Sequence, residues 1–216
     1  MTVNALARLT LIGLVYIYST KLIDTAYHGI FKHIAVATVI VGLNILAGLA
    51  QLAFFVVIYQ QYVPRDKPAL KYGALLAITG SAIGMFPKFL AMDVLFQPPW
   101  LFYFIRHGSQ IGAFCPWLMA MLLFTFCLLF LINCGAKEER SLKRAFIAGT
   151  IGWCVMAIVQ SLVVINYLAD GRVVWLNDFF KSGPILLVTF PTLTFICLSI
   201  FFLAFTTNDN QVFSKK

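Results

Sequence analysis

An uninterrupted apolar run from Ile34 to Tyr59 places the strongest constraint on the fold. Its twenty-six residues include no Asp, Glu, Lys or Arg, and about 20 apolar residues suffice for an α-helix to cross the hydrocarbon core of a bilayer. Soluble domains carry about 25% charged residues, whereas this chain has 11% charged and 61% hydrophobic residues. The sequence therefore excludes a soluble fold and predicts an integral membrane protein.

Five further apolar segments predict an all-α, polytopic transmembrane bundle of about six spanning helices. Prolines and charges separate them, as in Val63–Lys71, which holds two prolines and four charged residues. Leu101–Ile105 is expected to lie at the membrane interface before the fourth span. We expect a single transmembrane domain, residues 1–216, with spans near 9–30, 34–59, 72–96, 110–133, 145–168 and 183–205.

The distribution of Lys and Arg predicts that both termini are cytoplasmic. Short loops rich in these residues stay inside, and with the N-terminus inside, ten of the sixteen fall on the cytoplasmic side. Which membrane holds the protein is left open. The inside set is Arg8, Arg65, Lys67, Lys71, Lys137, Arg140, Lys143, Arg144, Lys215 and Lys216.

Several chemistries find no support in the residues. The net charge of +8 lies in short loops without interleaved aromatics, so lipid headgroups are the expected partner and nucleic acid is not. The five cysteines sit mostly within apolar runs and lack the C-x-x-C spacing. No G-x-S-x-G, H-E-x-x-H or phosphate-loop motif occurs, which favours a non-enzymatic protein without deciding the question.

Small and amide side chains predict where helices pack against one another. Asn44, Gly48 and Gln51 are spaced i, i+4 and i+7 and share one helical face. Small residues four apart let helices approach closely, and amides bond across helices. The same packing role is expected for Gly80 with Gly84 and for Gly108 with Gly112. Such contacts occur within one bundle, with a partner membrane protein or in a homo-oligomer.

Ionisable residues near the outer helix ends predict an outward-facing polar cavity. Groups of this kind are costly inside a membrane and point to function. The alternative is that each lies within two turns of the interface, where Lys snorkels and His and Asp are hydrated. The first span is affected most, because Lys21 and two of the candidates occupy its second half. The candidate ligand-binding residues are Asp24, His28, His33, Lys88, Asp93 and His107.

Two functions are compatible with such a cavity. The first is a small carrier or channel, or a subunit of a membrane complex. A transport role is suggested by Met85-Phe86-Pro87 and Thr189-Phe190-Pro191, which lie at similar depths and would fit an inverted repeat of three helices. The second is a redox enzyme or enzyme subunit whose histidines hold haem or a metal at the outer face.

Overall fold

The computed structural model describes six α-helices and no strand within residues 2–27, 34–63, 67–96, 101–133, 140–169 and 184–207. Side chains are described over 2–20, 22, 38–61, 63, 67–89, 112–133, 142–169 and 188–206. Each helix is long and apolar enough to cross a membrane, so the chain has the architecture of an integral multi-pass membrane protein. The helices are α1 (Val3–Tyr27), α2 (Ile34–Tyr62), α3 (Pro68–Phe96), α4 (Leu101–Asn133), α5 (Arg140–Leu168) and α7 (Pro184–Thr207).

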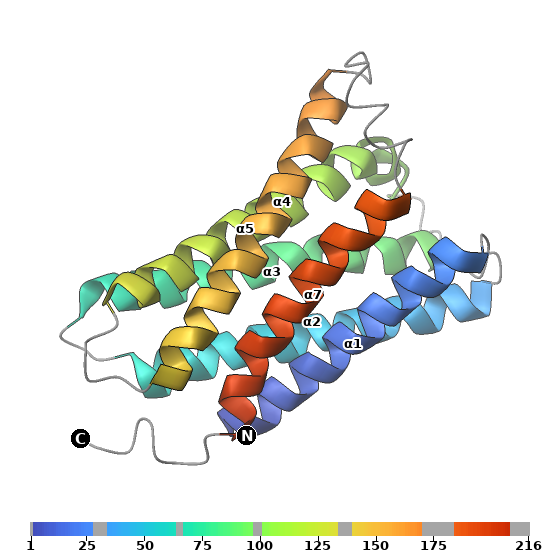
Figure 1. Cartoon of the computed structure of the whole chain (residues 1–216). Helices are drawn as coiled ribbons and strands as arrows, with labels where there is room; N and C mark the ends of the chain where they lie inside the picture. Colours follow the sequence, from blue (N-terminus) through green and yellow to red (C-terminus); the bar gives the residue numbers. More distant parts are fainter. Residues whose placement is uncertain are drawn as a thin grey trace.

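The helices form a closed ring in chain order. Each packs against its neighbours in sequence, α7 returns to pack against α1, and no other pair of helices makes backbone contact in the described residues. Successive helices alternate in direction, so α1 begins and α7 ends at the same end of the bundle (Figure 1). The four connections from α1 to α5 have at most six residues, and connections this short join antiparallel neighbours.

The ring order argues against an inverted repeat of two three-helix halves. A two-fold axis in the membrane plane would reverse the sense in which the second half travels around the ring. Here α1–α3 and α4–α7 follow the ring in the same sense. The matching Phe-Pro pairs at Pro87 and Pro191 lie within α3 and α7, but the two halves are not related as such a repeat requires.

α1, α3, α4 and α5 begin earlier than the sequence pattern indicated, α1 and α4 by the most. α1 begins at Val3, where the Thr2 hydroxyl accepts a hydrogen bond from the Ala5 amide at 3.3 Å and caps the first turn. α4 begins at Leu101 and incorporates the segment expected at the interface. No proline lies between Leu101 and Gln110, and the single glycine there, Gly108, is tolerated within a helix, so the segment continues into the span that follows.

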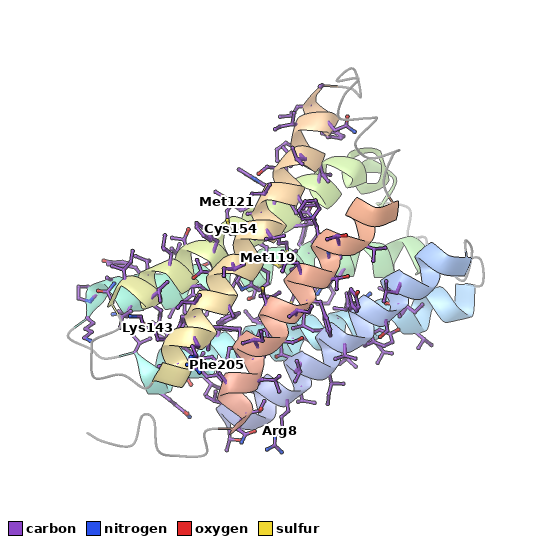
Figure 2. All side chains as sticks on the ribbon, in the orientation of Figure 1. Arg8, Met119, Met121, Lys143, Cys154 and Phe205 are labelled. Atoms are coloured by element: carbon purple, nitrogen blue, oxygen red, sulfur yellow. The ribbon has the colours of Figure 1, made fainter. Side chains whose placement is uncertain are left out.

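Except for Lys88, the described basic side chains gather at one end of the ring, where α1, α3 and α5 begin; we call it the basic end. Figure 2 labels Arg8 and Lys143 there. The gathering follows from the alternating helix directions, because α1, α3 and α5 all start at this end. All of these residues belong to the Lys and Arg set that the sequence analysis expects on the cytoplasmic side. That the basic end faces the cytoplasm stays a prediction. The residues are Arg8, Lys67, Lys71, Lys143 and Arg144.

The interior of the ring near the basic end is filled by phenylalanine, and we call this group the aromatic cluster. Its rings come from four helices and meet mostly edge to face, as for Phe54 with Phe202 at a centroid distance of 5.1 Å. All are buried. The members are Phe54 and Phe55 of α2, Phe126 and Phe130 of α4, Phe146 of α5, and Phe201, Phe202 and Phe205 of α7.

A polar contact at mid-height joins α1 to α7 and closes the ring. Tyr18 and Thr192 share a hydrogen bond of 2.6 Å between their hydroxyls. Thr192 donates its own hydrogen to the Val188 carbonyl, so Tyr18 is the donor in the pair. The Tyr18 ring also stacks on Phe195 at 4.5 Å.

We expect Tyr18→Phe to lower the free energy of unfolding by only about 0.6 kcal/mol, the average for side-chain hydrogen bonds between membrane helices. The stacking on Phe195 survives this change. Unfolding by SDS titration in mixed micelles measures it, with Tyr72→Phe on the lipid face as the control. A loss above about 2 kcal/mol would contradict this reasoning, because it exceeds the strongest such bonds.

Candidate functional site between α2 and α3

Of the six residues predicted to line a polar cavity, the structure describes the side chain of Lys88. Asp24, Asp93 and His107 lie within α1, α3 and α4, with side chains outside the described set, and His28 and His33 lie outside the described residues altogether. No three His, Cys, Asp or Glu gather as a metal site among the described side chains, a set without histidines. The six-residue cavity and the haem or metal hypothesis therefore stay predictions.

Lys88 faces the interior of the ring. It follows Ala74, Ala77 and Ser81 on one stripe of α3, at spacings of three, seven and fourteen residues from Ala74. The two alanines are fully buried and Ser81 is 3% exposed. The lipid-facing residues of α3, which include Phe86 and Phe89, occupy the opposite side.

The amine of Lys88 lies against the middle of α2. A Cβ built on Gly48 would be 3.1 Å from the Lys88 Nζ, and Gly48 is fourteen residues from each end of α2. Lysine side chains on helices tilt toward the helix start, which here carries the amine deeper into the bundle. This placement differs from the alternative in which Lys88 snorkels to the interface.

A matching stripe on α2 supplies the other wall. Asn44, Gly48 and Gln51 continue on the same face to Phe55, which is fully buried in the aromatic cluster. Gln51 donates to the Ser81 hydroxyl at 3.3 Å. The lining of the ring therefore changes along α2, from aromatic near the basic end to polar beyond Gln51.

The register between the two helices places Asn44 opposite Lys88. Gln51 pairs with Ser81, and α2 and α3 are antiparallel. Moving seven residues back along α2 and seven forward along α3 therefore leads from this pair to Asn44 and Lys88. The buried Oδ1 of Asn44 has no hydrogen-bond partner among the described residues. We call Asn44, Gly48, Gln51, Ser81 and Lys88 the α2–α3 seam.

The glycines predicted to pack helices divide into two groups. A Cβ on Gly80 would lie 3.0 Å from Leu122 Cβ, and one on Gly84 would overlap the Met119 sulfur, so both face α4. Gly48 faces α3 through Met85. Gly112 is exposed, and a Cβ there would meet no atom within 4 Å, so within the described residues no other helix packs against it. The side-chain position of Gly108 lies outside the described set.

Polar groups at the same level on other helices were not identified from the sequence. Trp117 donates to the Ser161 hydroxyl at 2.9 Å and links α4 to α5. Trp153 of α5 is 2% exposed, and its Nε1 has no partner within the described part of the chain. The seven-residue spacing from Ser81 to Lys88, which puts both on one helical face, is a sequence signal that could have identified Ser81.

Comparison with known proteins gives no indication of the function of this chain, which therefore has to be inferred from the geometry of the seam. No protein-family model, characterised protein or solved structure matches this chain. The fold and the seam define a helical multi-pass membrane protein with a cationic side chain inside its ring of helices.

Proposed function

We propose that the protein is a small carrier that admits a polar solute to the α2–α3 seam from the end of the ring opposite the basic end. The observation that carries this proposal is the position of the Lys88 amine against the midpoint of α2. An ammonium group at mid-membrane depth is costly and marks solute or ion pathways in membrane proteins. The aromatic cluster closes the basic end in this proposal.

The polar side chains of the seam face inward from α2, which favours a carrier over a complex subunit that binds its partner through polar contacts in the membrane. Asn44, Gly48 and Gln51 face α3 or the ring interior, whereas Val39, Leu43, Leu46 and Leu49 are the large exposed residues along the same part of α2. A polar interhelical contact with a second protein requires polar groups on the outer surface. Between Val39 and Gln51 of α2 the polar groups lie on the inner side.

Cysteine accessibility in sealed proteoliposomes tests the carrier proposal. Asn44→Cys is introduced after the five native cysteines are replaced by alanine, and a charged, membrane-impermeant thiol reagent is added from one side at a time. We expect Asn44→Cys to react at least about tenfold faster than Leu46→Cys, because thiolate formation requires water and Leu46 faces lipid. Phe55→Cys should stay unmodified behind the aromatic cluster.

The same experiment identifies the side of entry. Lys143→Cys reports the basic end, and Asn44→Cys should react from the opposite side. Variants are compared only if they elute as a single species in detergent. Equal, slow reaction of Asn44→Cys and Leu46→Cys from both sides would contradict a water-accessible seam and with it the carrier proposal.

A further inference from the structure

We infer that the carried solute is small and uncharged, and that the indole N–H of Trp153 on α5 donates a hydrogen bond to it. Carboxamides and polyols, which combine an acceptor with a donor, belong to this chemical class. The inference rests on the proposed carrier function and adds the class of the solute and a residue that selects it.

Trp153 carries a buried donor that no described residue satisfies. The residue is 2% exposed, and its Nε1 has no hydrogen-bond partner in the part of the chain that the structure describes. Buried polar groups are nearly always hydrogen-bonded, so an exception calls for an explanation. Trp117 shows the ordinary case, because its indole N–H donates to the Ser161 hydroxyl at 2.9 Å.

The position of Trp153 on α5 is the first one beyond the aromatic cluster on the inner face. It follows Phe146 by seven residues and therefore lies on the same side of the helix. Gln51 holds the corresponding place on α2, four residues before Phe55 of the cluster. The two side chains thus mark the boundary between the aromatic end of the ring and its polar part.

The packing of α4 places Trp153 at the level of the seam. A Cβ on Gly149 of α5 would lie 3.0 Å from the Cys127 sulfur of α4. Five residues back along α4 and five forward along the antiparallel α5 lead from this pair to Leu122 and to the residue after Trp153. Leu122 in turn packs against Gly80, the residue before the serine of the seam.

Small side chains line the ring beyond the indole. Ala157 is one helical turn further along the same face of α5, and the register with α4 places Ala120 opposite it. Both alanines are buried. Short side chains beside a donor without a partner leave room for a solute of few atoms.

The groups without partners along the path are uncharged. Asn44, two helical turns nearer the entrance than Gln51, has a buried Oδ1 that accepts no hydrogen bond. Lys88 has an interaction partner of its own within the chain. A neutral solute that can donate to Asn44 and accept from Trp153 matches the donor and the acceptor that remain, whereas an ion would find no opposite charge in either.

Protection of a thiol at Ala157 tests this inference with three matched probes. Ala157→Cys is introduced into the cysteine-free protein and labelled in proteoliposomes with the same impermeant reagent. The probes are acetamide, N,N-dimethylacetamide, which keeps the acceptor and lacks the donor, and acetate, which is charged. At three times its dissociation constant a solute leaves about a quarter of the sites free, so acetamide should slow labelling about fourfold.

We expect dimethylacetamide to protect Ala157→Cys less than acetamide, and acetate not to protect it. Trp153→Phe should raise the half-protecting concentration of acetamide about two- to tenfold, the effect of one hydrogen bond between neutral groups. Trp117→Phe is the matched control and should leave that concentration unchanged, because the Trp117 N–H already has a partner in Ser161. Unchanged labelling without any probe shows that each variant keeps the fold and the access path.

The fluorescence of Trp153 provides a second measurement that does not depend on replacing it. In a variant whose other three tryptophans are replaced by phenylalanine, protecting concentrations of acetamide should shift the emission maximum. An emission maximum that stays constant while acetamide protects Ala157→Cys would overturn the role of Trp153.

Two further results would overturn the inference. One is equal protection by acetamide in Trp153→Phe and in the parent; the other is equal protection by acetate and acetamide. Labelling of Asn44→Cys together with labelling of Ala157→Cys that no probe slows removes the uncharged solute and leaves the carrier proposal in place. Absence of labelling at both positions removes both.

Discussion

Phe54→Ala is expected to lower the free energy of unfolding by about 2–3 kcal/mol. Phe54 is fully buried, and its ring meets four others, those of Phe55, Phe201, Phe202 and Phe205, at centroid distances of 5.1 to 6.3 Å. Removing it leaves a cavity of ~100 Å³, which at about 24 cal/mol per Å³ costs about 2.4 kcal/mol. SDS titration followed by tryptophan fluorescence measures the loss.

This estimate omits the transfer term that applies in soluble proteins. A Phe→Ala change there costs about 3–5 kcal/mol, part of which is the transfer of the ring from water. In a bilayer the separated helices stay in lipid, which is as apolar as the ring itself. Phe86→Ala on the lipid face of α3 is the matched control and should cost less than about 1 kcal/mol. Equal losses for the two variants would show that the contribution of Phe54 to the free energy of unfolding does not come from packing inside the ring.

Gly149→Ala is expected to destabilise the bundle by about 1–2 kcal/mol, although alanine is the better helix former. An added Cβ would lie 2.8 Å from Cδ2 of Phe201 and 3.0 Å from the Cys127 sulfur. Both residues are fully buried and have no space into which to move. Overpacking costs typically about 1–3 kcal/mol, which exceeds the gain of about 1 kcal/mol in helix propensity.

Gly42→Ala on α2 separates these two terms. A Cβ there would meet no atom within 4 Å, so the propensity term acts alone and the variant should be as stable as the parent or up to about 1 kcal/mol more stable. The difference between the two glycine variants in the same SDS titration measures the packing term. Similar changes in both would show that α5 and α7 can separate at Gly149 without cost.

The number of helices was predictable because each span depends on local composition. Apolar runs long enough to cross a bilayer are visible without knowledge of their neighbours, and the six helices that can span agree with that expectation. Their ends were less predictable. α1 begins at a Thr2 cap that offers a single weak sequence signal, and Leu101–Ile105 joins α4 without a break that composition could reveal.

The candidate site was only partly predictable. The spacing of Asn44, Gly48 and Gln51 identified one face of α2, because helical periodicity is a local property. The sequence could not show that this face pairs with Ser81 and Lys88, because the pairing depends on which helix lies beside α2 and in what register. Gly112 shows the converse, because this member of a small-residue pair packs against no other helix in the part of the chain that the structure describes.

The sequence by itself determined that this is a helical, multi-pass membrane protein, because lipid leaves the backbone few other ways to satisfy its hydrogen bonds. It also identified Lys88 as a charge whose surroundings mattered. Only the tertiary structure decided that the helices close into a ring, that phenylalanines fill one end of it, and that Lys88 reaches the midpoint of α2. Those features depend on contacts between residues far apart in the chain, and the apolar side chains that face lipid are of the same types as those that face a neighbouring helix.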